Sequence, residues 1–125
     1  MNRDGRLSKN FRRSEFECPC CGKFIENSSL VLALERLRGE CGGLPIHILS
    51  GTRCEAWNEA VGGVPGSKHL LGLAADIVIR SMHPVEVAAK AEIVPAFSHG
   101  GVGTYHHRGF VHVDVRRDGP ARWDG

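Results

Sequence analysis

The chain has 125 residues, of which 42% are hydrophobic and 24% charged, with a formal net charge of +2. This length fits one domain over residues 1–125 with a modest core, and the composition is that of a globular protein rather than a disordered one. No apolar run reaches the roughly 18 to 20 residues that would span a membrane, and the small net charge gives no support to nucleic-acid binding.

The N-terminal residues carry positive charge with no hydrophobic stretch behind it, a pattern that does not fit a secretory signal. We therefore expect synthesis in the cytoplasm without a signal peptide. The same region predicts a flexible or extended arm over residues 1–15, with a nucleic-acid-binding surface as the alternative. Its basic residues are Arg3, Arg6, Lys9, Arg12 and Arg13.

The sequence contains five cysteines, an odd number that cannot be fully paired within one chain. Without a secretory signal, reduced thiols are the default. Cys18 and Cys21 have the two-residue gap of a tetrahedral metal site, but no second such pair follows. We expect packing roles for the cysteines, with a disulfide in the N-terminal segment or a metal or redox role as alternatives.

The first half of the chain predicts two helices and a strand. Apolar residues at helical spacing predict a helix over residues 30–37, capped by Asn27, Ser28 or Ser29 and ended by two glycines. Residues 45–49 then predict a short strand. A short helix is expected over residues 54–60 before the next pair of glycines.

The second half predicts three further strands and one more helix. Residues 73–80 read as a buried strand, and residues 84–93 as a helix with proline in its first turn, closed by Pro95. Residues 100–105 and 109–116 predict a hairpin with a three-residue turn. The predicted fold is a single α+β domain with a mostly antiparallel sheet flanked by two or three helices.

The last predicted strand carries polar side chains on one face. Side chains alternate across a strand, so the intervening valines belong in the core. The opposite face then has a histidine, a carboxylate and an arginine, which is typical of a surface or cleft that binds a ligand. The residues of this face are Phe110, His112, Asp114 and Arg116.

Asp76 lies in a run that otherwise favours burial, and a buried carboxylate is costly without a partner. Arg80, His112 or a divalent metal are candidate partners, and His69 lies upstream in a turn that can converge on the same point. Two imidazoles and one carboxylate leave a fourth position on a tetrahedral zinc ion for water, as in catalytic sites. A buried ion pair is the alternative for Asp76.

Two segments resemble the signatures of the zinc D-Ala-D-Ala carboxypeptidases and related peptidoglycan peptidases, which form subfamily A of the M15 peptidases. Residues 67–76 resemble the Ser-x-His-x-x-Gly-x-Ala-x-Asp motif, and residues 109–114 resemble the strand with the third ligand. The resemblance covers roughly residues 11 to 123 and implies a hedgehog/D-Ala-D-Ala peptidase-like fold. Further agreement comes from residues 16–22, Ser50-Gly51-Thr52-Arg53, Asn58, Val61-Gly62-Gly63 and Ala121-Arg122-Trp123.

The resemblance implies roles for particular residues. His69, Asp76 and His112 would be the zinc ligands. Arg53 would steady the substrate and the charge that develops on its carbonyl oxygen. Substrate contacts are expected from Ser67, for which a turn-forming role is the alternative, and from Tyr105.

Two positions depart from the family pattern. The dipeptidase branch has a glutamate base three residues before the last histidine ligand, and Gly109 stands there in this chain. Asp114 is the first candidate for another base, with orientation of a ligand histidine as the alternative, and His106 and His107 come next. Thr52 replaces a common tyrosine, which removes a local substrate contact.

The function implied is hydrolysis of peptide bonds in peptidoglycan stems by zinc-activated water, as a D-Ala-D-Ala carboxypeptidase or a murein endopeptidase. A catalytically inactive, zinc-stabilised cell-wall-binding module is the alternative, since the glutamate base is missing. We expect a monomer that acts in the periplasm or cell wall, in the manner of a phage or prophage lysis enzyme.

Overall fold

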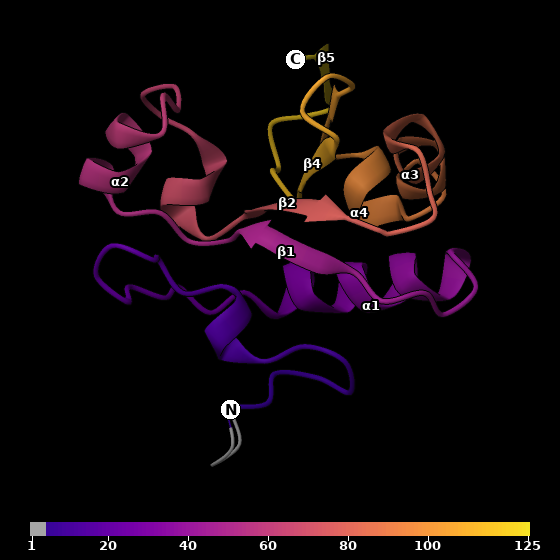
Figure 1. The fold of residues 1–125 in the computed structure, drawn as a ribbon, viewed down its shortest axis with the longest axis horizontal. Coiled ribbons are helices and arrows are strands. Elements are labelled where there is room, and N and C mark those ends of the chain that lie inside the picture. The colour runs from indigo at the N-terminus through magenta and orange to yellow at the C-terminus, as the bar shows by residue number, and fades with distance from the viewer. Residues whose placement is uncertain (1–4) are drawn as a thin grey trace.

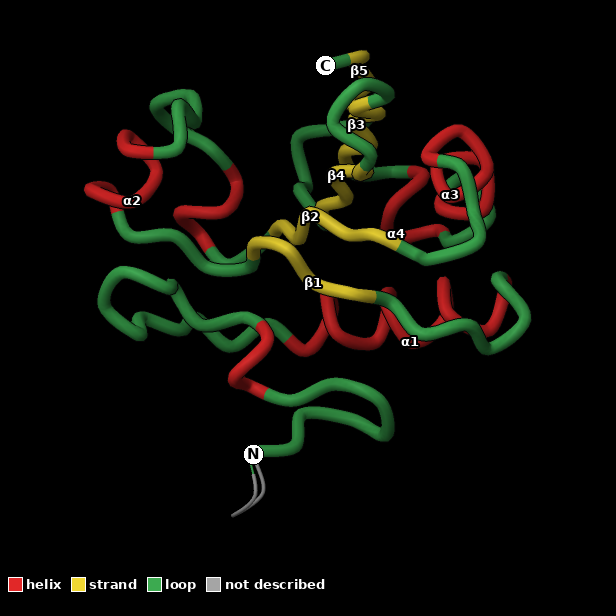
Figure 2. Tube along the Cα trace, viewed as in Figure 1, coloured by secondary structure: helices red, strands yellow, loops and turns green. Residues whose placement is uncertain are grey.

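A five-stranded sheet runs through the protein, whose computed structural model describes residues 5–125 (Figures 1 and 2). The strand order is β1-β2-β4-β3-β5, and every neighbouring pair is antiparallel except β3 and β5. The predicted α+β fold with a mostly antiparallel sheet is therefore confirmed. The strands are β1 (His47–Ser50), β2 (Ala74–Val78), β3 (Gly101–Tyr105), β4 (Phe110–Asp114) and β5 (Ala121–Asp124).

Short helices connect and cover the strands, and the longest of them begins at a clear cap. The Asn27 side chain accepts a hydrogen bond from the backbone N–H of Leu30 at 3.1 Å, as the predicted N-cap requires. Pro95 follows the third helix as predicted, but it also begins a fourth, because proline suits the first turn. The helices are α1 (Ser28–Glu40), α2 (Glu55–Ala60), α3 (Pro84–Ala91) and α4 (Pro95–Ser98), with 3-10 helices η1 (Arg13–Glu15) and η2 (Lys68–Leu71).

The hydrophobic core lies against one face of the sheet. Val111 and Val113 of β4 are fully buried, as the alternation of the sequence predicts. Helices α1, α3 and α4 pack on this face and contribute to the core, so the opposite face of β2 and β4 is left for polar side chains. The buried helical residues include Leu34, Leu37, Val87, Ala91 and Phe97.

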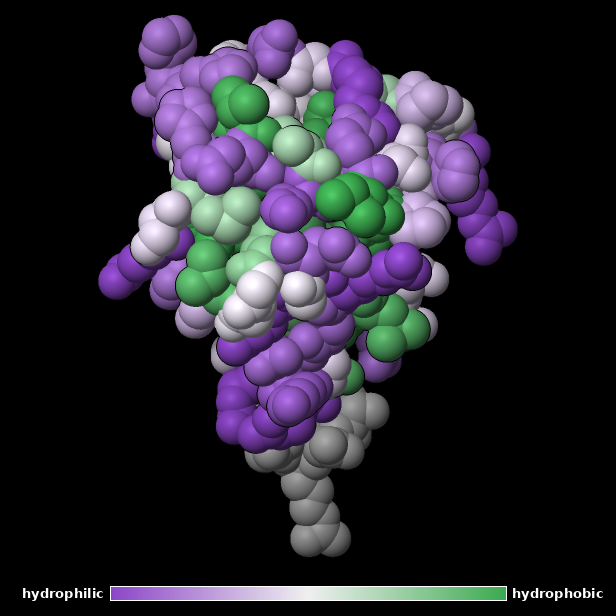
Figure 3. All heavy atoms as spheres, turned by 90° about the vertical axis from the view of Figure 1, so that its right-hand side faces the viewer, coloured by the Kyte–Doolittle hydropathy of each residue, from purple (hydrophilic) through white to green (hydrophobic). Residues whose placement is uncertain are grey.

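The side of the molecule beside α3 shows hydrophobic side chains in small patches separated by hydrophilic ones (Figure 3). A broad apolar face is therefore not presented on that side. Within residues 5–125, no helix has the length and hydrophobicity that a membrane crossing requires.

Within the described residues 5–16, the N-terminal segment packs against α1, whereas a flexible or extended arm was expected over residues 1–15. Phe11 and Phe16 are buried and meet edge to face, with ring centroids 6.0 Å apart. Ser8 Oγ donates to a Glu35 carboxylate oxygen at 2.5 Å, and Asn10 donates to the same carboxylate from its backbone and side chain. These contacts were not expected because aromatic burial so close to the terminus has no periodic pattern. Of the basic residues expected in the arm, Arg3 lies outside the described residues.

Replacing Glu35 with glutamine is expected to lower the free energy of unfolding by about 1.5 kcal/mol at pH 7, because hydrogen bonds to a charged acceptor become neutral ones. Burial raises the pKa of Glu35, but hydrogen bonds from Asn10 and Ser8 outweigh it and hold the pKa below its ordinary value. A lowered folded-state pKa gives stability that is present above about pH 4.3 and is lost as the pH falls through the folded-state pKa. Denaturant unfolding at pH 7 and at pH 3 checks this, and an equal difference at both values would contradict it.

Candidate metal centre

One row of residues crosses all five strands at the same level of the sheet. Asp76 of β2 pairs with Ser50 of β1 on one side and with His112 of β4 on the other. His112 then pairs with Gly103 of β3, which pairs with Trp123 of β5. Because paired residues share a face of the sheet, this register brings the carboxylate and one imidazole together opposite the core.

His69 reaches the same point from η2, outside the sheet. The hydroxyl of Ser67 accepts from the His69 backbone N–H and caps this short helix, and Gly72 ends it with a φ of 73°. The His69 ring is buried, with Nδ1 2.8 Å from the Gly51 carbonyl oxygen and Nε2 3.1 Å from Asp76 Oδ1. The turn thus holds the imidazole with one nitrogen directed at the carboxylate.

The His112 ring is also held on both sides by carboxylates. Its Nδ1 lies 3.2 Å from Asp76 Oδ1, and its Nε2 lies 2.7 Å from Asp114 Oδ2. Burial lowers the pKa of His112, but hydrogen bonds with Asp114 and Asp76 outweigh it and raise the pKa above its ordinary value. The two histidine rings meet edge to face, with centroids 5.1 Å apart.

The hydrogen-bond acceptors around the two rings decide which nitrogens are left as ligands. The Gly51 carbonyl oxygen can only accept, so a neutral His69 carries its N–H on Nδ1. The ionised Asp114 carboxylate also only accepts, so a neutral His112 carries its N–H on Nε2. When both rings are neutral, the remaining nitrogens present lone pairs to Asp76 Oδ1. A second proton on either ring turns that contact into a hydrogen bond to the carboxylate. A divalent cation among these atoms would remove the repulsion between their lone pairs, and outer acceptors of this kind are typical of metal-binding histidines.

Three ligand atoms from His69, Asp76 and His112 all lie within 4.8 Å of one another. Two imidazole nitrogens and a carboxylate oxygen are the donor set of catalytic zinc sites, which keep a further position open. The residues therefore fit a divalent metal, and the three predicted ligands are the ones that the fold brings together.

Arg53 holds the second oxygen of the Asp76 carboxylate. Its Nη2 donates to Asp76 Oδ2 at 3.0 Å, its Nη1 to Asn58 Oδ1 at 3.1 Å and its Nε to Ser50 Oγ at 3.0 Å. A side chain at Gly63 would collide with Asn58 and with the guanidinium group, because a Cβ there would lie 2.0 Å from Asn58 Oδ1. Asn58 and Gly63 had no role assigned from the sequence beyond their agreement with the family pattern. In the structure they orient Arg53.

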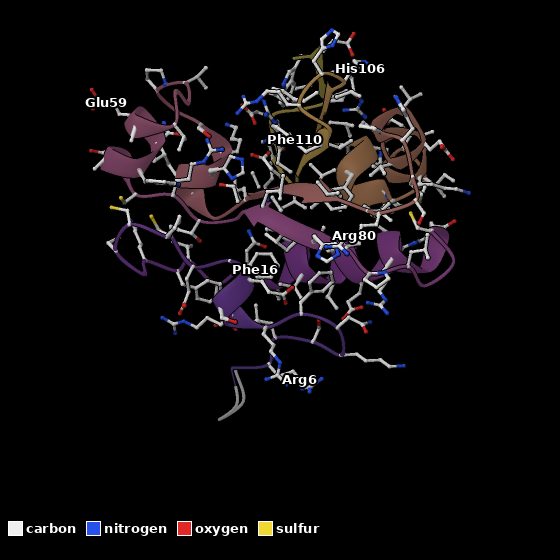
Figure 4. The ribbon with its side chains drawn as sticks, in the orientation of Figure 1. Arg6, Phe16, Glu59, Arg80, His106 and Phe110 are labelled. Atoms are coloured by element: carbon white, nitrogen blue, oxygen red, sulfur yellow. The ribbon has the colours of Figure 1, made fainter. Side chains whose placement is uncertain are left out.

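Charge and hydrogen bonding keep Asp76 ionised in spite of its burial. Burial raises the pKa of Asp76, but hydrogen bonds and charge interactions with His112 and His69 outweigh it and hold the pKa well below its usual range. Burial lowers the pKa of Arg53, while the Asp76 charge raises it. The partner of Asp76 is therefore Arg53 together with the two histidines, whereas Arg80, considered from the sequence, is exposed at the end of β2 (Figure 4).

Asp114 is fully buried, and both of its oxygens are occupied. Oδ2 accepts from His112 Nε2 and from Arg116 Nη2, each at 2.7 Å, and Oδ1 accepts from the Arg116 backbone N–H at 3.0 Å. Burial raises the pKa of Asp114, but its bonds with His112 and Arg116 hold it well below the usual range. Of the two roles that the sequence left open, this geometry suits the orientation of His112 rather than a base.

A cavity of about 720 Å³ is lined by the three candidate ligands and by residues of α2, β3 and β4. Among the described residues that line it, Asp76 is the only carboxylate. Four basic side chains line the same cavity. Three of them form ion pairs with carboxylates of the described residues, and Arg108 is the one for which no such pair is found there. The four basic residues are Arg53, Lys68, Arg108 and Arg116.

Tyr105 and Ser67, predicted as substrate contacts, both line the cavity. The Tyr105 hydroxyl oxygen accepts from Trp123 Nε1 at 2.9 Å, and its ring stacks on Phe110 with centroids 4.4 Å apart. Ser67 also has the turn-forming role considered for it. Thr52 is buried and accepts from the Ile25 backbone N–H, so its side chain supports the N-terminal segment instead of the cavity.

The turn histidines lie apart from the metal ligands. His106, at the tip of the hairpin, is exposed and contacts Asp124 at 3.3 Å (Figure 4). Neither His106 nor His107 lines the cavity formed by the described residues. Gly109 has a φ of 75°, a conformation that strains other residues, so the turn itself accounts for glycine at this position.

Trp123 is a cavity residue to which sequence reasoning assigned no role. Its ring lies 4.9 Å from the His112 ring, and it occupies the space that Gly103 leaves open. Its position next to His112 depends on the parallel pairing of β5 with β3, which no local sequence pattern predicts.

Replacing Gly103 with alanine is expected to displace Trp123 and to lower the free energy of unfolding by about 2 kcal/mol, because overpacking forces neighbouring side chains to move. A Cβ at this position would lie 2.3 Å from the indole ring. Tryptophan fluorescence and denaturant unfolding check the change. Gly39→Ala is a suitable control, because nothing lies within 4 Å of its added Cβ, and equal stability of the two variants would contradict the prediction.

Comparison with known proteins agrees with the metal centre. A search of curated proteins finds no match to this chain. A family model described as Peptidase M15 matches residues 9–114, a range that contains Arg53, the three ligands and Asp114. Peptidases of this family depend on a metal ion. The match spans most of the sequence, and the chain therefore belongs to the peptidase M15 family.

Proposed function

We propose that the protein is a zinc peptidase that hydrolyses peptide bonds in the stem peptides of bacterial peptidoglycan. The observation that carries this proposal is the convergence of His69 Nε2 and His112 Nδ1 on Asp76 at the edge of a basic cavity. Zinc held by these residues would supply a Lewis acid that can activate water and polarise a peptide carbonyl. We place this action in the cell wall, where such a substrate occurs.

The charge of the cavity supports a peptide substrate that carries carboxylates. Peptidoglycan stems present free carboxylates close to their scissile bonds, and basic side chains would bind them. Arg108 is exposed, lies with its guanidinium 5.4 Å from the Phe110 ring centroid, and has no carboxylate partner within residues 5–125. We assign to Arg108 the binding of a substrate carboxylate.

Arg53 and Tyr105 would contact the reacting peptide. Arg53 uses three of its five N–H groups within the protein, which leaves two for the carbonyl oxygen of the substrate. The Tyr105 oxygen accepts from Trp123, so its own O–H proton is available to a substrate oxygen or to the leaving amine. Asp114 would hold His112 in the tautomer that leaves Nδ1 free.

Arg108→Gln is expected to raise KM about fivefold with little change in kcat, since a surface charge pair contributes up to about 1 kcal/mol. Arg80→Gln is the matched control, because Arg80 is exposed and does not line the cavity. Steady-state kinetics on a stem peptide with a free C-terminal carboxylate would check this. Equal KM values for the two variants would show that Arg108 does not bind the substrate carboxylate.

The proposed activity is tested by incubating the zinc-loaded chain with purified peptidoglycan and with synthetic stem peptides. Mass spectrometry then detects released D-alanine or opened cross-links. The wild type is expected to release product and His112→Ala to release none, while His47→Ala, at an exposed histidine of β1, keeps the full rate. If the chain binds zinc at His69, Asp76 and His112 and still releases no product, the proposed peptidase activity is wrong.

A second candidate, an inactive zinc-stabilised module that binds the cell wall, is favoured by one observation. Asp76 is the only carboxylate among the described residues of the cavity, and Asp114 is engaged with His112 and Arg116. A module would retain binding to peptidoglycan and release no product. In that case His112→Ala would alter stability or wall binding alone.

A further inference from the structure

Four of the five cysteines meet at a place that the sequence did not predict. Cys18, Cys20 and Cys21 lie in one loop of the N-terminal segment, and Cys54 lies immediately before α2. Figure 4 shows sulfur atoms gathered where this loop passes beside α2. The four Sγ atoms all lie within 4.8 Å of one another. The packing role expected for the cysteines suits the buried Cys41, but Cys20 and Cys21 are exposed.

We propose that these four thiolates form a second, structural zinc site. The Sγ atom of Cys54 lies 3.7 Å from that of Cys18 and 3.7 Å from that of Cys20. Four thiolates at about 2.3 Å from a tetrahedral zinc ion have their sulfur atoms about 3.8 Å apart. Sulfur atoms joined in a disulfide are only about 2.05 Å apart. The two separations from Cys54 match those of zinc-bound thiolates and are too long for a disulfide.

The backbone of the loop directs its sulfur atoms to one point. The Gly22 N–H donates to the Cys18 carbonyl at 2.7 Å, and Gly22 has a φ of 77°, so the chain turns back after Cys21. Cys18 and Cys21 have the two-residue gap that is common among thiolate zinc ligands. Cys54 Sγ accepts from the Trp57 N–H at 3.4 Å, which fixes the position of this sulfur at the start of α2.

The number of ligands indicates a structural site. Four cysteine ligands complete a tetrahedron and leave no position for water, in contrast to the three ligands around Asp76. Cys54 follows Arg53 directly in the chain, and Pro19 of the cysteine loop lines the cavity. Zinc at the cysteines would therefore fasten the N-terminal segment to the segment that carries Arg53, and so hold one wall of the cavity in place.

Metal counting on variants tests this site separately from the proposed peptidase site. Under reducing conditions, inductively coupled plasma mass spectrometry is expected to find two zinc ions per wild-type chain and one in Cys20→Ser and Cys54→Ser. Cys41→Ala, outside the cluster, should keep two, and His112→Ala should keep the one at the cysteines. If only the proposed peptidase site does not bind zinc, the wild type would contain one zinc ion and the cysteine variants none. A wild-type zinc count that the cysteine variants leave unchanged would overturn the proposal.

A spectroscopic measurement on the wild type avoids dependence on the folding of variants. Cobalt(II) is added in place of zinc to the reduced, metal-free chain. Intense thiolate-to-cobalt charge-transfer absorption, with the pattern of a tetrahedral site, is the expected result. Absence of this absorption, or an intact mass that shows the four cysteines joined as disulfides in the freshly purified protein, would contradict a zinc site.

Discussion

Replacing Asp76 with asparagine is expected to remove one metal ion per chain and to lower the rate of peptide hydrolysis about a thousandfold. The variant keeps the shape of the side chain, but it removes the charge shared by His69, His112 and Arg53. Loss of about 4 kcal/mol of transition-state stabilisation corresponds to about a thousandfold lower rate. Arg53 would also lose its buried partner, which we expect to lower the free energy of unfolding by about 3 kcal/mol.

The effect of Asp76→Asn is measured by metal content, by the rate of stem-peptide cleavage and by denaturant unfolding. Asp124→Asn is the matched control, because Asp124 is exposed on the C-terminal strand and its ion pair is with the turn histidine His106, away from the metal ligands. The control should keep its metal and its rate. A variant of Asp76 that keeps both would show that the carboxylate is not a ligand.

Replacing Asp114 with asparagine is expected to weaken metal binding at His112 about 10- to 100-fold, because the hydrogen bond to Nε2 is then made to a neutral group. Most of the activity should return at saturating zinc if Asp114 only orients His112. A catalytic base would behave differently: its loss would lower kcat at every zinc concentration and leave the metal affinity unchanged. Zinc titration with activity as the readout separates these outcomes.

The interpretation of the Asp114 variant needs a control for its second partner, Arg116. Arg116 donates to Asp114 from its backbone and its guanidinium, so the variant leaves this cation without its carboxylate. Asp118→Asn, at an exposed aspartate that contacts Lys68, changes the nearby charge by the same amount. If both variants bind zinc equally well, Asp114 has no influence on the metal site.

Local sequence patterns predicted the elements that position the ligands. The spacing of Leu30, Leu34 and Leu37 predicted α1, and alternation in the last predicted strand placed Val111 and Val113 in the core and His112 opposite them. Burial of a carboxylate within an apolar strand signalled that Asp76 needs partners. Such features depend on periodicity and desolvation, which are properties of short segments.

Contacts between distant segments could not be predicted in this way. The partnership of Arg53 with Asp76, the pairing of β5 beside β3 and the approach of Cys54 to the cysteine loop all depend on how separate turns meet. A C-x-x-C gap with no second pair gave little reason to expect four thiols together. The packing of the N-terminal segment could not be predicted for a similar reason, because it depends on hydrogen bonds from Asn10 to Glu35 in α1.

Anomalous diffraction at the zinc absorption edge, from crystals of the zinc-loaded chain, would locate the metal ion independently of any activity. We expect a peak within bonding distance of His69 Nε2, His112 Nδ1 and an oxygen of Asp76. A crystal with zinc bound elsewhere and no peak among these three side chains would contradict this expectation.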